Sequence, residues 1–293
     1  YRPLVTLTYF FDYAFWKDDP FGFHVTNVLL HTINVVFVFW LLCLFLNDRT
    51  LAFVAAVFFS VHPINAETVN AISFREDILV AFFTFLTLIS YYYYRLGRNT
   101  RRKMTYALLS LTAFSGALFT KEIAVMIVPV LIIFEYLFLS GVRKKRITIF
   151  AEPLYYGYVS AVGAYLLIWG YYFNGLGNAY DVYTYQGGNF YTAFLTFIHV
   201  LARYGVWLLF PSFIYTTLAV KQHPFSVTQI ADGRFLLALA VLLAAVYLIM
   251  RTRRKTFVVV GGALWFVLFL LPASGLIPLA NIFAARYIYL PSV

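Results

Sequence analysis

The chain has 293 residues, of which 62% are hydrophobic and 12% are charged, and its mean hydropathy is +0.80. Soluble domains carry about 45–50% apolar and about 25% charged residues, so this composition excludes an ordinary soluble domain and indicates a polytopic membrane protein. The net charge of +10 does not indicate nucleic-acid binding, because the basic residues form short clusters between apolar runs, as cytoplasmic loops do. A single cysteine, Cys43, excludes an internal disulfide.

Apolar runs recur along the chain and are separated by short polar segments. A membrane-spanning helix needs about 20 residues, and most of the runs approach that length. In chain order the runs cover residues 23–46, 51–61, 78–94, 104–119, 123–140, 148–172, 191–219, 235–250 and 256–273. We therefore predict an all-α fold, a polytopic transmembrane helical bundle that forms a single domain over residues 1–293.

The basic clusters orient this bundle. They comprise Arg49, the group Arg95, Arg98, Arg101, Arg102 and Lys103, the run from Arg143 to Arg146, and the group Arg251, Arg253, Arg254 and Lys255. Lysine and arginine concentrate in cytoplasmic loops, so we place all four clusters inside. The segments 62–77, 120–122, 173–190 and 274–293 are then predicted to lie outside, together with Tyr1.

One apolar run does not fit the alternation of loops between the inner and outer sides. If residues 191–219 crossed the membrane, Arg251 to Lys255 would lie outside. We predict instead an interfacial or re-entrant helix on the outer side, interrupted by Pro211, with His199, Arg203 and Tyr204 facing an outer cavity. A full crossing remains the alternative. This topology has eight spans and one interfacial helix.

The run 51–61 is too short to cross. At 1.5 Å per residue it covers about half of a ~30 Å hydrocarbon core. The polar stretch from His62 to Glu67 is therefore predicted to lie below the outer surface. Polar groups persist at that depth where they line a wet cavity or are buried in protein.

Unusual polar residues gather on the predicted outer side. The candidate binding residues are Arg2, His24, His62, Glu67, Arg75, Asp77, Lys121, Glu122, Arg286 and Tyr287. Cations beside carboxylates at membrane depth suit an anionic lipid head group and a polar acceptor, because arginine pairs with phosphate bidentately and lysine supplies a point charge.

Plainer interpretations remain open for some of these positions. His24, Asn27 and His31 share one helical face, and a polar stripe satisfied by neighbouring helices would explain His31. Lys121 and Glu122 could be a mutually neutralising loop tip. A divalent metal on His62 and Glu67 is possible but not favoured, since the chain has no HExxH motif or cysteine cluster.

Several short motifs, taken together, resemble a known family. The sequence is similar to the membrane part of the transmembrane and tetratricopeptide-repeat O-mannosyltransferases, which have the GT-C glycosyltransferase fold. The matching motifs are Tyr1-Arg2-Pro3-Leu4, the run from Gly22 to His31, His62-Pro63 with Glu67, the run from Arg75 to Leu79, Thr120-Lys121-Glu122 and the run from Arg286 to Ser292.

The resemblance implies an enzyme that transfers a sugar, mannose or another hexose, from a polyprenyl-phosphate carrier to a hydroxyl of a protein or glycan acceptor outside the cytoplasm. On this basis we assign Arg75, Lys121 and Arg286 to the phosphate, and His62, Glu67 and Asp77 to the sugar or acceptor. The family's key acidic motif would precede residue 1, so no catalytic residue is assigned here. Tetratricopeptide repeats are expected after Val293.

Two other function classes remain open. A transporter or flippase for a lipid-linked or polar solute would need a polar lining that continues to the cytoplasmic side, where the runs are almost purely apolar. A structural membrane scaffold would not explain the arginine and lysine residues at loop tips. We expect membrane lipids as surroundings, no nucleic-acid partner, and a prokaryotic cytoplasmic membrane, or the endoplasmic reticulum membrane in a eukaryote.

Overall fold

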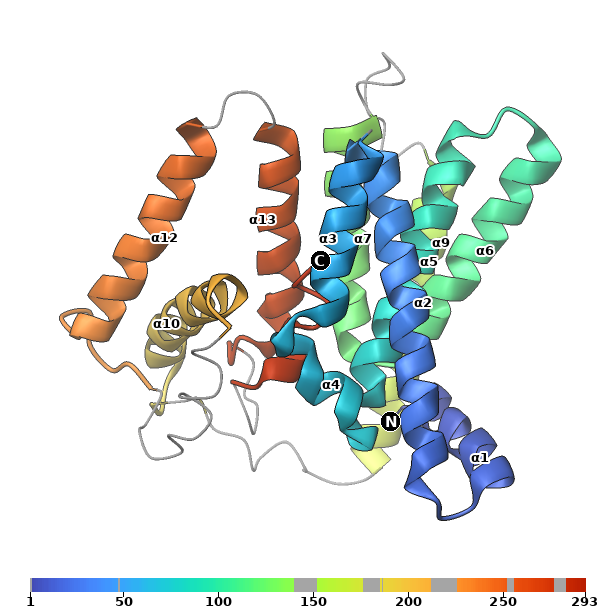
Figure 1. Ribbon diagram of the computed structural model, residues 1–293, viewed down its shortest axis with the longest axis horizontal. Coiled ribbons are helices and arrows are strands. Elements are labelled where there is room, and N and C mark those ends of the chain that lie inside the picture. Colours follow the sequence, from blue (N-terminus) through green and yellow to red (C-terminus); the bar gives the residue numbers. More distant parts are fainter. Residues whose placement is uncertain are drawn as a thin grey trace.

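The computed structural model describes residues 2–46, 48–139, 152–175, 185, 187–211, 226–251, 256–276 and 283–293. Every regular element in these residues is helical, which confirms the predicted fold class, an all-α membrane bundle. Most of the long helices run side by side, and most of the short elements gather at one end (Figure 1).

The longer helices occupy the predicted apolar runs. They are α2 (Pro20–Leu46), α3 (Arg49–Val61), α5 (Arg75–Leu96), α6 (Thr100–Leu118), α7 (Ile127–Phe134), α9 (Pro153–Gly175), α10 (Phe190–Leu209), α12 (Gly233–Arg251) and α13 (Thr256–Leu270). The remaining elements are α1 (Pro3–Trp16), α4 (Ala66–Asn70) and the short turns η1 (Pro63–Asn65), η2 (Ile72–Phe74), η3 (Glu122–Met126), η4 (Glu135–Leu139), η6 (Leu271–Ala273) and η7 (Ala285–Ile288). Helix α1 lies before the first predicted run and was not expected.

Short polar side chains fix where several helices begin. The Asp48 carboxylate accepts the backbone N–H groups of Thr50 and Leu51 at the start of α3. Asn99 does the same for the first turn of α6, and Asn189 forms a capping box with Thr192 at the start of α10. Such caps satisfy N–H groups that have no partner inside the helix, so they stop the helices at the polar segments.

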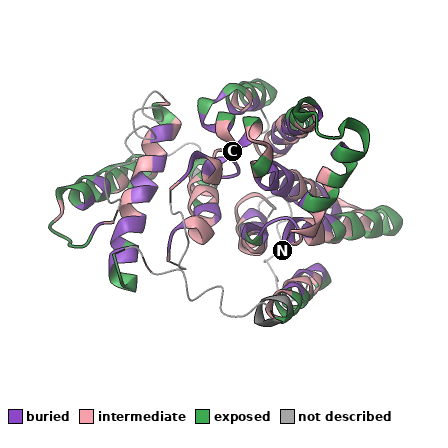
Figure 2. Ribbon diagram, turned by 90° about the horizontal axis from the view of Figure 1, so that it is seen from below, coloured by how far each residue is buried: buried purple, intermediate pink, exposed green. Residues whose placement is uncertain are grey.

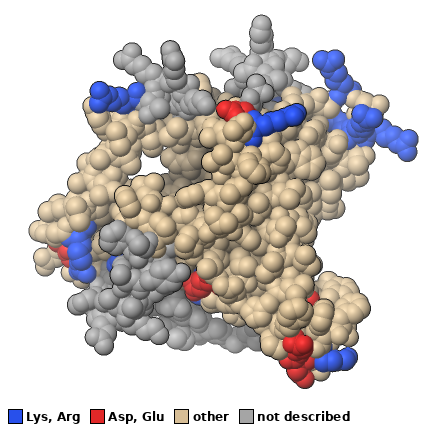
Figure 3. All heavy atoms as spheres, viewed as in Figure 1, with Lys and Arg blue, Asp and Glu red and all other residues tan. Residues whose placement is uncertain are grey.

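The bundle has two chemically different ends. The turns α2–α3 and α5–α6, the end of α12 and the start of α13 lie at one end (Figure 1). We call it the basic end because it carries Arg49, Arg98, Arg101 and Arg251. Helices α1 and α4 lie at the other, which we call the α1 end. On the face shown in Figure 3, charged side chains gather toward the two ends and leave an uncharged band between them. The described basic clusters therefore share one side, as predicted; Arg143 to Arg146 and Arg253 to Lys255 lie outside the described residues.

Helix α10 lies crosswise to the bundle. It is seen lengthwise in the view from below, where most of the other long helices are seen nearly end-on (Figure 2). The helix ends at Leu209, before Pro211, and so does not reach residue 219. This orientation matches the predicted interfacial helix, although the length and composition of α10 would also permit a crossing.

Length and apolar composition single out fewer spans than the eight that we predicted. Among the described residues, α2, α10 and α12 could cross a membrane by these criteria. A fourth span arises if α3 and the following η1–α4 segment, bent by 46°, are counted together. Helices α7 and α13 have 8 and 15 residues, fewer than the about 17–25 that a crossing needs, and the number eight remains a prediction.

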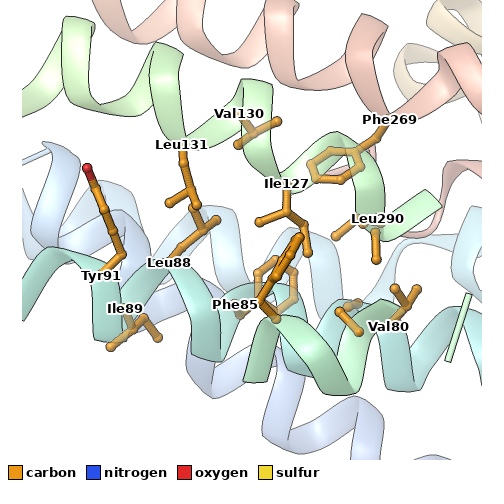
Figure 4. Packing of buried hydrophobic residues seen from close by; sticks show 14 of the residues in the cluster. Val80, Phe85, Leu88, Ile89, Tyr91, Ile127, Val130, Leu131, Phe269 and Leu290 are labelled. Atoms are coloured by element: carbon orange, nitrogen blue, oxygen red, sulfur yellow. The ribbon is translucent and has the colours of Figure 1, made fainter. Parts of the chain in front are cut away.

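The hydrophobic core is built around α5. Ile78, Phe85 and Leu88 on this helix are at most 1% exposed, and they pack against α7 and the C-terminal segment. Figure 4 shows α5 side chains facing Ile127 and Leu131 of α7. Because α5 begins with Arg75, Glu76 and Asp77, this packing also fixes the polar residues at the α1 end.

Candidate functional site at the α1 end

Ion pairs connect three separate segments at the α1 end. Arg2 at the start of α1 contacts Glu76 at 2.6 Å and Glu122 at 3.3 Å. Lys121 contacts Asp77 at 2.5 Å and Glu76 at 4.0 Å. We call these five residues the ionic cluster; Glu76 joins its two halves.

Local structure places each member of the ionic cluster. Glu76 and Asp77 lie in the first turn of α5, where the positive end of the helix dipole favours carboxylates. Lys121 and Glu122 lie where α6 turns into η3, and the Lys121 backbone N–H donates to the Ala117 carbonyl. Helix geometry therefore brings acids and bases from distant sequence positions together.

Arg286 and Tyr287 extend the ionic cluster from η7. The Lys121 ammonium lies 5.7 Å from the centre of the Tyr287 ring. The Arg286 guanidinium lies 3.7 Å from the Glu67 carboxylate and stacks 4.2 Å from the Phe74 ring. The Arg286 backbone N–H also donates to Glu67 at 3.3 Å. The structure thus brings Arg2, Asp77, Lys121, Glu122, Glu67, Arg286 and Tyr287 into one continuous set.

Arg75 lies beside this set but is fully buried. Its guanidinium donates to Asn27 at 2.7 Å and to the Phe23 carbonyl at 2.9 Å, and it pairs with Asp12 at 2.5 Å. The ring centre of Tyr9 lies 4.6 Å away. Every guanidinium nitrogen is engaged, so Arg75 joins α1, α2 and α5, and its surroundings do not support the phosphate contact predicted for it.

A polar stripe on α2 is satisfied by its neighbours. Asn27 binds Arg75, while His31 contacts the Tyr289 hydroxyl at 2.7 Å and the Ser60 carbonyl at 3.2 Å. The carbonyl can only accept, so Nε2 of His31 carries the proton and Nδ1 accepts from Tyr289. Asn34 continues the stripe by donating to the same hydroxyl and to the Ile78 carbonyl. The plainer interpretation of His31 is confirmed.

His24 does not belong to this stripe. Its side chain is exposed and lines an open cleft of about 670 Å³. Tyr9 and Phe23 form part of the wall, and Glu76 connects the cleft to the ionic cluster. His24 is therefore close to the candidate site, but it is exposed near the start of α2, two turns before the buried His31.

His62 occupies the bend between α3 and η1. Its Nδ1 accepts the Ile64 backbone N–H at 3.1 Å, and its Nε2 donates to the Leu208 carbonyl of α10 at 3.2 Å. The ring is buried and outside the ionic cluster. In the described part of the chain, no group of three or more histidine, cysteine, aspartate or glutamate residues is placed to hold a metal ion.

Helix α10 holds the segment that leads into η7. The Tyr204 hydroxyl donates to the Ala284 carbonyl and accepts the Ala284 N–H, at 3.1 and 2.9 Å. Arg203 lies 4.9 Å from the Phe283 ring. Tyr204 is thus buried rather than facing an outer cavity as predicted, because its ring stacks on Phe283 and its hydroxyl bonds to the Ala284 backbone.

The ionic cluster changes the acid–base properties of its exposed members. Burial opposes ionisation of Glu122, but Arg2 and Lys121 outweigh this effect and hold its pKa below the usual value. Burial likewise disfavours charged Arg2, yet Glu122, Glu76 and Asp77 raise its pKa above the usual value. Both groups therefore stay charged at neutral pH.

Glu76 and Asp12 were not among the predicted binding residues. Glu76 joins the two halves of the ionic cluster, and Asp12 is the counter-ion of Arg75. Glu76 lies within the charged triplet at residues 75–77, which is the only sequence signal for it. A second buried network at the basic end links Arg95 to Glu135 and Glu152.

Known proteins provide an independent comparison. No protein-family model matches the chain, and no solved structure is detectably similar. The chain is 31% identical to protein O-mannosyl-transferase TMTC1 of Homo sapiens over 153 residues, which are 50% of this chain and 17% of that protein. It is 26% identical to protein O-mannosyl-transferase Tmtc3 of Drosophila melanogaster over 180 residues, 53% of this chain and 19% of the relative.

A third relative, protein O-mannosyl-transferase tmtc2 of Xenopus laevis, is 38% identical over 92 residues, 31% of this chain and 11% of that protein. The chain spans less than a fifth of the length of these relatives. All three are animal proteins, so the expected prokaryotic membrane gains no support. The predicted resemblance to the protein O-mannosyl-transferases is confirmed over about half of the chain.

Proposed function

We propose that this chain is the membrane part of a glycosyltransferase that moves mannose, or another hexose, from a polyprenyl-phosphate carrier to a hydroxyl of a protein or glycan. The observation that carries the proposal is the convergence of Arg2, Lys121, Arg286 and four carboxylates at one end of an apolar bundle. Relatives named protein O-mannosyl-transferases support the reaction class.

The donor phosphate is assigned to Arg2, Lys121 and Arg286. Arg2 is held by Glu76 at 2.6 Å but reaches Glu122 only at 3.3 Å, and Arg286 reaches Glu67 only at 3.7 Å. The two longer distances are typical of weak pairs. A phosphate offers bidentate geometry to a guanidinium and can replace such a carboxylate. The shorter Lys121–Asp77 pair keeps η3 in place. Arg75 positions α1 and α5, and does not touch the donor.

The sugar is assigned to the neighbouring carboxylates and the cleft. Oδ2 of Asp77 is buried and has no hydrogen-bond partner in the described structure. Unsatisfied buried acceptors are rare and costly, so this atom is a suitable acceptor for a sugar hydroxyl. The cleft lined by Tyr9, Phe23 and His24 adjoins Glu76 and gives the acceptor chain a place to approach.

A transfer assay with the full-length protein tests this function. The protein is reconstituted in vesicles with a labelled polyprenyl-phosphate mannose and a membrane-protein acceptor. Label on the acceptor supports the proposal, whereas label that only crosses the vesicle membrane supports a flippase and contradicts it.

The matched variants are Arg286→Gln and Arg98→Gln. Arg286 lies in the site, whereas Arg98 is an exposed arginine at the basic end. Losing a charge-assisted hydrogen bond to phosphate costs about 1.5–3 kcal/mol, so Arg286→Gln is expected to lower kcat/KM by roughly 10- to 100-fold. Arg98→Gln is expected to leave it unchanged. Equal activity of both variants would remove Arg286 from the site.

A further inference from the structure

Basic side chains gather at the start of α6, at the basic end of the bundle. Arg101 and Arg102 are exposed there, and Lys103 beside them is partly buried. None of the ion pairs among the described residues involves these three side chains, whereas each cation of the ionic cluster has a carboxylate partner. On the face shown in Figure 3, the basic side chains at the α5–α6 turn have no acidic side chain next to them. We call Arg101, Arg102 and Lys103 the α6 basic turn.

The backbone of the α6 basic turn is held by a cap. The Asn99 side chain accepts the backbone N–H groups of Arg101 and Arg102 at 2.9 and 3.2 Å, and the Asn99 carbonyl accepts that of Lys103 at 2.9 Å. Because the cap already satisfies these three N–H groups, an anion at this position has to be bound by the side chains. The Lys103 ammonium is itself held 4.8 Å from the centre of the Tyr94 ring.

A group of aromatic side chains marks the depth of this turn in the membrane. Tyr93 of α5 and Tyr106 of α6 stack with their ring centres 5.3 Å apart, and the exposed Trp40 of α2 donates its indole N–H to the Tyr93 hydroxyl at 3.1 Å. Tryptophan and tyrosine concentrate where the hydrocarbon meets the headgroups. Arg102 precedes Tyr106 by four residues, which is about 6 Å along the helix. Since the headgroup layer is about 5–8 Å thick, the α6 basic turn lies at the level of the lipid phosphates.

An apolar stripe on α6 continues from the basic turn toward the middle of the bundle. Arg101, Met104 and Leu108 have the spacing i, i+3, i+7 and therefore share one face of the helix. Met104 and Leu108 are 59% and 58% exposed. A lipid whose headgroup lies at Arg101 can lay an acyl chain along this face. An acidic segment of a soluble protein would match the charges but would leave the stripe uncovered, so the observations favour a lipid.

We propose that the α6 basic turn binds the headgroups of anionic phospholipids in the leaflet at the basic end. A guanidinium pairs with a phosphate bidentately, and a lysine ammonium adds a point charge. The phosphate of a zwitterionic lipid is neutralised by the lipid's own ammonium group, so the excess positive charge of the turn selects lipids with a net negative charge, such as phosphatidylserine. The site lies at the opposite end of the bundle from the ionic cluster and does not depend on the proposed transfer reaction.

Competition photolabelling tests this site. The full-length protein in phosphatidylcholine nanodiscs is labelled with phosphatidylserine that carries a diazirine near the top of one acyl chain. We expect label in the peptide that contains Met104 and Leu108, and displacement of that label by unlabelled phosphatidylserine but not by added phosphatidylcholine. Each basic residue near an anionic surface strengthens binding about fivefold, so Arg101→Gln/Arg102→Gln is expected to weaken phosphatidylserine binding roughly 25-fold.

The matched control removes the same charge elsewhere at the basic end. Arg49 and Arg251 are exposed, and Arg49→Gln/Arg251→Gln is expected to leave the labelling of this peptide unchanged. An equal loss in both double variants would show that the overall charge of the basic end, and not the α6 basic turn, selects the lipid, and would overturn the proposal. Equal displacement by the two lipids, or displacement by a soluble acidic peptide, would contradict it as well.

Discussion

Arg75 was predicted to contact phosphate, but it has a structural role. Its position in a charged triplet suggested a phosphate contact, but the folded chain surrounds it with Asp12, Asn27 and the Phe23 carbonyl. A guanidinium offers five donors in a fixed plane, so it can join three helices where a lysine could not. In this protein Arg75 joins α1, α2 and α5 at the α1 end.

Removing Arg75 is therefore expected to destabilise the fold. Arg75→Ala leaves Asp12 as a buried, uncompensated charge, and such a loss costs about 3–5 kcal/mol. Thermal unfolding in detergent should show a clear decrease in Tm, and the exposed Arg98→Ala should show none. In Asp12→Ala/Arg75→Ala, part of the loss is expected to be recovered. A wild-type Tm for Arg75→Ala would contradict the structural role.

The stability that Glu122 contributes is expected to depend on pH. Its pKa is lowered in the folded protein, so its ion pair with Arg2 contributes stability above the unfolded pKa of about 4.3 and loses it as the pH falls through the lower folded value. The Tm difference between wild type and Glu122→Gln should be constant near neutral pH and vanish in acid. Asp18→Asn, at an exposed carboxylate, is the control. A difference that persists in acid would show that the charge of Glu122 is not its cause.

Among the elements, the break after α3 has the largest structural consequences. Pro63 cannot continue a helical hydrogen-bond ladder, and His62 satisfies the Ile64 N–H that follows. The same ring ties the bend to α10 through Leu208. Helices α3 and α10 are thereby coupled, and α10 in turn orders the segment that carries Arg286.

The crosswise position of α10 can be tested by cysteine labelling. In a Cys43→Ala background, Tyr191→Cys and Leu209→Cys place a thiol near each end of α10, at exposed positions. For an interfacial helix, a membrane-impermeant reagent should label both from the same side of sealed vesicles. Arg98→Cys at the basic end should react from the opposite side. If residues 191 and 209 reacted from different sides, α10 would be a crossing helix.

At the scale of the whole molecule, two charged networks close the two ends of an apolar bundle. At the basic end Arg95 lies between Glu135 and Glu152, and the Tyr91 hydroxyl donates to Glu135 at 2.7 Å. At the α1 end the ionic cluster and η7 contain the candidate site. Buried charges are costly unless paired, so each network stabilises its own end.

The two networks should act independently, because they lie far apart and share no partner. Glu135→Gln is expected to lower Tm but leave KM for the donor unchanged, whereas Arg286→Gln is expected to raise KM. In the double variant the two effects on the free energy of unfolding should add within about 0.5 kcal/mol. A larger deviation, measured by denaturant titration, would show that the ends are coupled.

The helices and their boundaries were largely predictable from the sequence. Apolar runs of helical length and the short run before Pro63 are local signals, and the structure follows them. Helix α1 was missed because its aromatic residues precede the first long run. The sidedness of the described basic residues was also predictable, because charge and hydropathy act on each loop separately.

The candidate site was predictable only as a set of residues on one side. The sequence could not distinguish Arg75, which is buried among three helices, from Arg2, which keeps exposed surface, because burial depends on which helices pack together. The same limit applies to His24 and His31. They lie seven residues apart on one helix, yet His24 is exposed and His31 is buried.

Taken by itself, the sequence determined the membrane class, most of the helices, the shared side of the described basic residues and the resemblance to protein O-mannosyl-transferases, since composition and short motifs are properties of the chain. The tertiary structure decided which charges pair and which arginine is buried among three helices. Those properties arise from contacts between residues far apart in the sequence, and packing alone selects such contacts.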